Sequence, residues 1–377
     1  MSLFSSDQYK WFTWRIFLVL PFLSVLFVAG CESASPAKHI PNMPSPISVP
    51  SPINVPSPIS TPSASGITEF PLQQGDILNG ITAGPDGALW FTVNSSHADI
   101  ERITVQGTIT GFHIPTESRN PLFEGITAGP DGALWFTINA KPARIGRITV
   151  QGKVTEFTVP DSGPYQITAG PDGALWFTDD SGVIGRITVQ GTITEFAVPT
   201  RSHIEGITAG PDGALWFTED TGTTSKIGRI TVQGKITEFP IPGFPQGITA
   251  GPDRALWFIE DTGTWATRAS SKIGRITVEG KITEFPIPTA IRLPHGTNGI
   301  TSGPDGALWF TEFVANKIGR ITVEGKITEF ALPGYSETPD QITAGPDGAL
   351  WFTEYGEPKI GRLMIQSKPS YSGLHKA

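Results

Sequence analysis

The sequence has little of what most catalytic centres and nucleic-acid-binding surfaces require. Among 377 residues there is one cysteine, and none of the six histidines has the spacing of a zinc site. No glycine-rich phosphate loop and no serine nucleophile elbow are present. Charged residues make up only 16% and are interspersed, with a formal net charge of -8, so no basic stripe can follow a phosphate backbone. The composition gives no sign of catalysis and argues against nucleic acid as a partner.

A single long apolar run lies near the N-terminus. Lys10 and Arg15 precede it, and it ends in Val28-Ala29-Gly30-Cys31. A basic flank, a short apolar core and small residues predict a secretory signal peptide over residues 1–31, and the last four residues resemble a bacterial lipobox, which would lipidate Cys31. The alternative is an uncleaved transmembrane anchor, because Trp11 to Gly30 is just long enough to span a bilayer. Both readings predict a bacterial, exported protein anchored on the extracytoplasmic side of a membrane.

Residues 32–66 are rich in proline and serine. A six-residue repeat of the form Pro-Ser-Pro-Ile-Ser-Val begins at Pro44, Pro50 and Pro56. Such a segment favours an extended spacer of about 3.1 Å per residue, roughly 100 Å at full stretch. We expect a stalk without a packed core, and the alternative is a proline-rich docking site.

The rest of the chain is built from one repeated phrase. Near-identical copies of Gly-Ile-Thr-Ala-Gly-Pro-Asp-Gly-Ala-Leu-Trp-Phe-Thr recur about every 40 residues, each followed by further short β-type runs. This pattern predicts an all-β, seven-bladed β-propeller of four-stranded blades over residues 67–366, followed by a tail at 367–377. The repeated tryptophans, which we expect to pack between blades, are Trp90, Trp135, Trp176, Trp216, Trp257, Trp309 and Trp351.

The fourth unit shows how one blade is expected to form. The inner strand begins at Ile207, Ala214 to Thr218 is the second strand, Ile227 to Val232 the third, and Ile236 to Phe239 the outer one. Gly210-Pro211-Asp212-Gly213 has the residues of a tight turn between the first two strands. Alternating apolar residues predict burial between neighbouring blades of Ile207, Leu215, Phe217, Ile227 and Ile230.

The last unit lacks an outer strand. A spare copy of that strand, Ile67-Thr68-Glu69-Phe70, stands before the first unit. We expect it to pair with the third strand of the last unit, Ile360 to Leu363, and so to close the ring without an open edge.

Repeated charges are expected to form ion pairs between strands. An arginine lies on the third strand of every unit and a glutamate on the outer strand of nearly every blade, as in Arg229 and Glu238, and we expect these two to pair. Acids also end several second strands, where a ring of carboxylates is one way to bind a divalent cation. In four blades, however, a lysine opens the third strand beside that acid, as Lys226 does beside Glu219, which favours ion pairs.

Recognition is expected on the face whose loops differ between units. The two largest departures are adjacent: the loop Glu260 to Ser271, and the connection Thr289 to Asn298 into blade six. An aromatic side chain beside arginines and a histidine is suited to a planar or acidic ligand, and the alternative is a loop that packs its own tryptophan. We expect a monomer that binds a small molecule, glycan or protein through Trp265, Arg268, Arg292, His295 and Asn298.

Three phrases taken together, Gly-Pro-Asp-Gly-Ala-Leu-Trp-Phe-Thr-Glu, Lys-Ile-Gly-Arg-Ile-Thr and Lys-Ile-Thr-Glu-Phe-Pro-Ile-Pro, resemble the virginiamycin B lyase (streptogramin lyase) family. The resemblance covers all seven units and implies a seven-bladed propeller. It also implies a magnesium-dependent elimination that linearises streptogramin B antibiotics at their ester bond without hydrolysis. That chemistry needs a base for the acidic α-proton and a cation for the developing negative charge.

The resemblance also implies where the site residues should be. Histidines are expected just before the Gly-Ile of the last two blades, where this chain has Asn298 and Asp340, and an acid is expected where it has Thr338. Glu354 matches a second acidic ligand for Mg²⁺, and His295 resembles a displaced family histidine. These departures leave two hypotheses: a tethered ligand-binding propeller, or an active Mg²⁺-dependent carbon–oxygen lyase with His295 or Asp340 as base.

Overall fold

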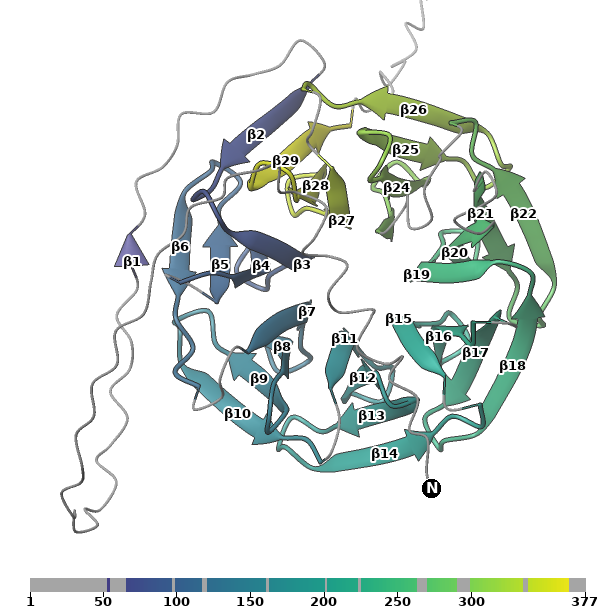
Figure 1. Ribbon diagram of the computed structural model, residues 1–377, viewed down its shortest axis with the longest axis horizontal. Helices are drawn as coiled ribbons and strands as arrows, with labels where there is room; N and C mark the ends of the chain where they lie inside the picture. The colour runs from purple at the N-terminus through teal and green to yellow at the C-terminus, as the bar shows by residue number, and fades with distance from the viewer. Residues whose placement is uncertain are drawn as a thin grey trace, which may run out of the picture. The chain divides into compact units, whose positions relative to one another are not determined.

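The computed structural model describes residues 53–54, 66–96, 99–116, 121–160, 163–200, 202–222, 225–262, 270–289, 299–334 and 338–365. The chain divides into Met1–Ile47, which lies outside these residues, and Ser48–Ala377, which holds the propeller. Every element in the described residues is a strand. Seven antiparallel sheets surround a common centre (Figure 1), which confirms the predicted all-β, seven-bladed propeller.

Each blade runs from an inner strand at the centre to an outer strand at the rim. Blade one contains β3 (Ile77–Ala83), β4 (Leu89–Asn94), β5 (Ile100–Ile103) and β6 (Ile109–Phe112). Blade two contains β7 (Leu122–Ala128), β8 (Leu134–Asn139), β9 (Arg144–Ile148) and β10 (Val154–Thr158). Blade three contains β11 (Pro164–Ala169), β12 (Leu175–Asp179), β13 (Val183–Ile187) and β14 (Ile193–Ala197). Blades four and five contain β15 (His203–Ala209), β16 (Ala214–Asp220), β17 (Ser225–Thr231) and β18 (Ile236–Ile241); and β19 (Phe244–Ala250), β20 (Leu256–Thr262), β21 (Ser270–Ile276) and β22 (Ile282–Pro286). Blade six contains β23 (Ile300–Ser302), β24 (Leu308–Glu312), β25 (Lys317–Ile321) and β26 (Ile327–Ala331), and blade seven contains β27 (Pro339–Ala344), β28 (Ala349–Glu354), β29 (Lys359–Met364) and β2 (Ile67–Pro71).

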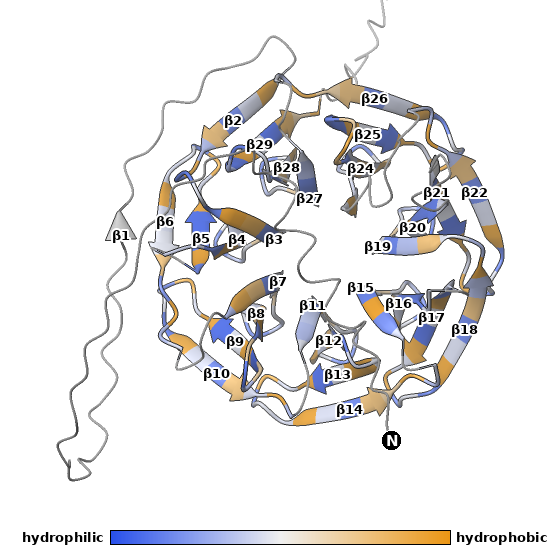
Figure 2. Cartoon of the chain, in the orientation of Figure 1, coloured by the Kyte–Doolittle hydropathy of each residue, from blue (hydrophilic) through white to orange (hydrophobic). Residues whose placement is uncertain are grey.

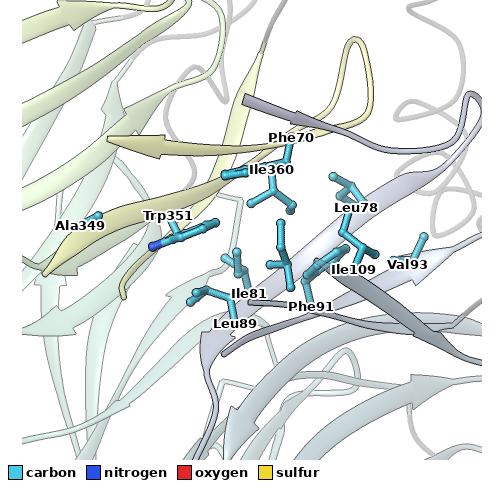
Figure 3. Close-up of a cluster of buried hydrophobic side chains, with 11 residues drawn as sticks. Phe70, Leu78, Ile81, Leu89, Phe91, Val93, Ile109, Ala349, Trp351 and Ile360 are labelled. Carbon is cyan, nitrogen blue, oxygen red and sulfur yellow. The ribbon is translucent and has the colours of Figure 1, made fainter. Parts of the chain in front are cut away.

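The N-terminal strand closes the ring as predicted. Strand β2 pairs antiparallel with β29, in a register that runs from Ile67 opposite Leu363 to Pro71 opposite Lys359. Phe70 stacks on Trp351 with ring centroids 5.4 Å apart, as the outer-strand phenylalanine does in the other blades. Figure 3 shows both rings beside blade-one side chains such as Phe91. The first strand of the propeller therefore joins its last blade to its first.

The core consists of hydrophobic clusters between adjacent blades. In one such cluster Trp216 packs with Leu256 and Phe258 of the next blade. All seven repeated tryptophans are at most 3% exposed, so the prediction that they serve packing is confirmed. The alternation of hydrophobic and hydrophilic residues along the outer strands is visible in Figure 2.

The repeated arginine does not pair with the outer-strand glutamate, so that prediction was wrong. The Nε of Arg229 lies 2.6 Å from Oδ2 of Asp212 in the turn, and Trp216 Nε1 donates to the other oxygen at 3.1 Å. The reason is the register: Arg229 is opposite Thr237, whereas Glu238 is opposite Gly228, so the two side chains lie on opposite faces of the blade. The same Asp–Arg pair occurs in all seven blades.

The outer-strand glutamate bonds the third-strand lysine instead. The Nζ of Lys226 is 2.7 Å from Oε2 of Glu238, although the residue directly opposite Lys226 is the second-strand Glu219. Blades five, six and seven have the same ion pair, and in blade two Arg144 takes the place of the lysine, 2.8 Å from Glu156. Each such lysine therefore lies between two carboxylates. In blades four, five and six it bonds the outer one, so the predicted ion pair with the second-strand acid was wrong there.

Two features outside the regular repeats complete the fold. Strand β1 (Ile53–Asn54), from the proline-rich segment, pairs antiparallel with β6. At the turn of blade five Arg254 has a φ of 61°, where the other units have glycine. No helix in the described ranges is long and apolar enough to cross a membrane.

Candidate ligand site on the inner strands

The predicted ligand-binding residues of the two variable loops lie outside the described residues. Trp265 and Arg268 fall in residues 263–269, and Arg292, His295 and Asn298 fall in residues 290–298, both outside the described residues. Cys31 lies outside them as well. These candidate residues stay predictions, whereas Thr338, Asp340 and Glu354 are described.

One repeat position on the inner strands has the same geometry in every blade where it is described. Between Leu78 and Ile81 the inner strand of blade one takes three steps while β4 takes two, from Val93 to Phe91, which is a β-bulge. The same shift occurs in five other blades. The first bulged residues, which we call the inner-strand ring, are Asn79, Glu124, Tyr165, Glu205, Gln246 and Asp340.

The ring residues lie near the centre of the propeller. Each inner strand contacts the inner strands of both neighbouring blades, which together form the closed inner circle seen in Figure 1. Bulges commonly re-aim side chains beside active sites and at barrel rims. Because successive ring residues come from successive blades, this position brings side chains far apart in the sequence to one place.

A buried threonine of the preceding blade bonds the backbone of four ring residues: Glu124, Tyr165, Glu205 and Asp340. Thr92 accepts a hydrogen bond from Gly80 N at 2.9 Å and donates to the carbonyl of Glu124 in the next blade at 2.7 Å. Thr137 and Thr311 donate in the same way to the carbonyls of Tyr165 and Asp340. These bridges fix the ring residues relative to one another.

Blade five cannot make this bridge to blade six, because its sequence has Ile259 where the other blades have threonine. Ile259 is fully buried in the hydrophobic cluster between the two blades. The threonine hydroxyl that would bridge to blade six is therefore missing, and Asn298 is the residue of blade six at the ring position.

Glycine after the ring residue lets adjacent inner strands approach closely. A Cβ on Gly80 would lie 2.8 Å from the carbonyl oxygen of Glu124, and one on Gly125 would lie 2.9 Å from that of Tyr165. Blades three and seven have Gln166 and Gln341 in place of this glycine, and the bridge from Thr178 to the carbonyl of Glu205 is 3.2 Å long. This hydrogen bond is longer than the 2.6 to 2.7 Å bonds that Thr92, Thr137 and Thr311 donate to the next blade.

The ring is polar and acidic. Asn79, Glu124, Gln246 and Asp340 are buried, whereas Tyr165 and Glu205 are half-buried. Asn79 Nδ2 donates to the carbonyl of Phe123 at 2.7 Å. Three of the six described positions are carboxylates and none is basic, so the ring suits a ligand that offers hydrogen-bond donors or positive charge.

A histidine and an aspartate next to the ring were missed from the sequence. The Tyr165 and His203 rings lie with centroids 6.2 Å apart. Burial raises the pKa of Asp180, the carboxylate of Asp179 adds to this, and His203 opposes it. The repeats did contain a signal for this region. Tyr165 and Glu205 occupy the same repeat position as the candidate residue Asp340, and His203 lies two residues before Glu205.

Blade seven places Asp340 and Glu354 on paired strands. Pro339 is opposite Glu354 in the β27–β28 register, and Tyr355 N donates to the carbonyl of Thr338 at 3.1 Å. Thr338 has a φ of 32°, unusual for a β-branched residue, and its Oγ1 is buried without a hydrogen-bond partner. Backbone strain of this kind is found preferentially at functional sites.

Glu354 belongs structurally to the set of acids that end the second strands. It is fully buried and lies opposite Lys359, whose Nζ is 3.3 Å from Oε2 of Glu69 on the outer strand. Strand alternation places Glu354 on the same side as Phe352, in the space between blades.

The described donors do not fit a Mg²⁺ site. Hard divalent cations take several oxygen ligands, usually with carboxylates among them. Within the described ranges no group of three or more His, Cys, Asp or Glu side chains is placed to hold a metal ion. Thr338, a neutral residue, stands where the resemblance implies an acid.

The comparison with known proteins agrees with this architecture. The model of the virginiamycin B lyase family matches residues 65–295 and 260–374. The chain belongs to this family. None of the curated proteins compared with the chain matches it.

Solved structures support the same conclusion. Selenomethionine-substituted virginiamycin B lyase from Staphylococcus aureus is 42% identical, with 80% of this chain and 99% of that chain covered and a TM-score of 0.70. A catalytically inactive histidine-to-alanine variant of that enzyme, with quinupristin, gives the same values. A streptogramin B lyase structure is 40% identical over 80% of this chain and 99% of that chain, with a TM-score of 0.69. The family resemblance read from the repeats is confirmed.

Proposed function

We propose that this protein is a ligand-binding member of the virginiamycin B lyase family. It holds a streptogramin B-type cyclic depsipeptide, or a small molecule of similar size and polarity, at the inner-strand ring without opening the ester bond. The observation that carries the proposal is the ring itself: six polar side chains at one bulged position, with Asn298 and Asp340 where the family resemblance implies histidines.

The replaced residues argue against elimination. Removing a carbon-bound α-proton requires a base whose pKa is near the working pH. Asparagine cannot accept that proton, and an aspartate carboxyl ordinarily has a pKa of about 4, which makes it a weak base. In a related enzyme, loss of one histidine accompanies loss of catalysis. The ring in this chain therefore supports binding better than turnover.

The second candidate function is an active lyase. Asp340 and Glu354 are both acidic and lie on paired strands, which favours it. In this alternative Asp340 or His295 would remove the proton and Glu354 would be one ligand of a Mg²⁺ that stabilises the developing negative charge, although the described residues alone do not complete such a site.

Location forms part of the proposal. The lipobox-like sequence ending at Cys31 and the Pro/Ser-rich segment support a lipid-anchored protein that carries the propeller on the extracytoplasmic side of a membrane. A depsipeptide bound there is held before it enters the cytoplasm.

Calorimetric titration with quinupristin tests binding at the ring. We expect saturable binding that Tyr165→Phe and Glu205→Gln each weaken by about 1 kcal/mol, the net contribution of one hydrogen bond. Glu279→Gln is the matched control, because Glu279 is exposed in a third-to-outer turn away from the ring. Absence of binding, or equal binding by all four proteins, contradicts the proposal, and binding of a glycan or protein at the same residues would replace its ligand.

A further inference from the structure

The outer strand of blade one differs from every other outer strand. The other six carry a glutamate at their centre, as in Glu69 and Glu156, whereas β6 reads Ile109-Thr110-Gly111-Phe112 and carries no charge. Charges and prolines protect exposed sheet edges against unwanted strand pairing. Strands β2, β18 and β22 also contain a proline, and β6 contains none. Blade one therefore has an edge that is not protected by its own sequence.

In blade one the acid lies on the third strand instead of the outer strand. Glu101 on β5 is directly opposite Gly111, whereas in the other blades a third-strand glycine is opposite the outer-strand glutamate, as Gly146 is opposite Glu156. Glu101 is 1% exposed. Blade one therefore keeps one acid, Glu101, but has no acid on its edge strand β6.

This edge is paired with the stalk. Ile53 is opposite Gly111 and Asn54 is opposite Thr110, so β1 adds a fifth strand to blade one. Figure 1 shows β1 beside β6 at the rim. Ile109 and Phe112 are 2% and 6% exposed, as buried as Ile67 and Phe70 of β2, whereas the corresponding residues of β10, β14, β18, β22 and β26 are only half-buried.

The repeat of the stalk offers three equivalent strands. Ile53-Asn54 has counterparts in Ile47-Ser48 and Ile59-Ser60, each within a Pro-Ile segment of the same hexad. Strand addition is held by main-chain hydrogen bonds, which do not distinguish these dipeptides. Prolines flank each hexad and cannot donate to a further strand, so a docked hexad also protects the new edge.

We propose that β6 is a strand-acceptor site for the Pro-Ile hexads of residues 44–61, and that the three hexads occupy it interchangeably. Exchange of one hexad for the next moves the docking point by six residues, about 19 Å of extended chain at 3.1 Å per residue. The choice of docked hexad thus sets how many residues of the stalk remain unpaired before the docking point. This inference is independent of the ligand bound at the ring.

Hydrogen exchange of the full-length chain tests the proposal. We expect the β6 amides to exchange about fivefold more slowly than in a chain with Ile47, Ile53 and Ile59 all changed to proline, the ratio expected for one main-chain hydrogen bond. Changing Ile53 alone should leave protection in place, because another hexad replaces it. The amides of β10 serve as the internal control.

A second variant tests the acceptor edge. Glu101→Gly with Gly111→Glu restores the ordinary repeat in blade one and should remove the protection while the propeller stays folded. If the triple proline variant keeps full protection, the stalk is not the occupant. If Ile53→Pro alone abolishes protection, the hexads are not interchangeable. If protection appears only at concentrations where the chain dimerises, the strand on β6 comes from a second copy of the chain. Each of these results overturns the proposal.

Discussion

Replacing Glu260 and Glu312 with glutamine should make the stability of the propeller much less dependent on pH between about pH 5 and pH 8. Glu312 is fully buried. Burial raises the pKa of its carboxyl to about 7, the carboxylate of Glu329 adds to this, and the ammonium of Lys317 opposes it. Glu260 has the same surroundings in blade five, and burial raises its pKa to about 7 as well.

The sign of the effect follows from these shifts. Because the pKa in the folded state is above that in the unfolded chain, each carboxyl keeps its proton in the fold while the unfolded chain loses it. The unfolded state then binds fewer protons, so the free energy of unfolding falls as pH rises from about 4.5 through 7. For a shift of this size the loss between about pH 5 and pH 8 is about 2 to 3 kcal/mol per carboxyl, or about 5 kcal/mol for the pair.

The turn aspartates act in the opposite direction. Burial favours the protonated form of Asp212, but hydrogen bonds from Trp216 and Arg229 outweigh it and lower the pKa of this carboxyl below its ordinary 3.8. The other six turn aspartates have lowered pKa values as well. Their stabilisation is present above that value and is lost as pH falls through the lowered pKa. Stability should therefore be highest in mildly acidic solution.

Urea unfolding followed by tryptophan fluorescence at about pH 5 and pH 8 measures the effect. Between these values the wild-type protein should lose about 5 kcal/mol more than Glu260→Gln/Glu312→Gln. Glu324→Gln, which changes an exposed glutamate, is the control and should behave as the wild type. The reasoning is refuted if the double variant keeps the wild-type dependence on pH.

Three further changes test other parts of the structure. Arg254→Gly should stabilise the propeller by about 1 kcal/mol, because a side chain at a φ of 61° is strained; an unchanged melting temperature would show that the turn has adapted. Deleting Gly66–Pro71 should lower the melting temperature far more than deleting Glu32–Ser65, because only the former removes β2; equal melting would disprove the closure. Cys31→Ser should abolish metabolic lipid labelling, and ordinary labelling would favour a plain transmembrane anchor.

The blades and their closure could be predicted because the chain serves as its own alignment. A spare Ile-Thr-Glu-Phe strand before the first unit and a missing one after the last leave one way to close the ring, and Ile67–Pro71 pairs accordingly. The ion pairs were predicted less well. Arg229 and Glu238 lie on adjacent strands, but their registers differ by one residue, which places the side chains on opposite faces.

The inner-strand ring could not be derived from residue types alone. Its members differ from blade to blade, and the bulge that gathers them is a backbone feature without a sequence motif of its own. Alignment of the units does bring Tyr165, Glu205 and Asp340 into one column, but only the register shift shows why that column matters. The variable loops stand out in the sequence because an insertion interrupts the repeat, whereas the ring position does not.

The most direct test is the fate of quinupristin incubated with the purified protein and Mg²⁺, followed by liquid chromatography. Elimination leaves the mass unchanged, so the linear product must be resolved by its retention, with Staphylococcus aureus virginiamycin B lyase as the positive control. We predict that this protein binds quinupristin and leaves it cyclic. Mg²⁺-dependent linearisation that disappears in His295→Ala or Glu354→Gln would contradict it and establish an active lyase.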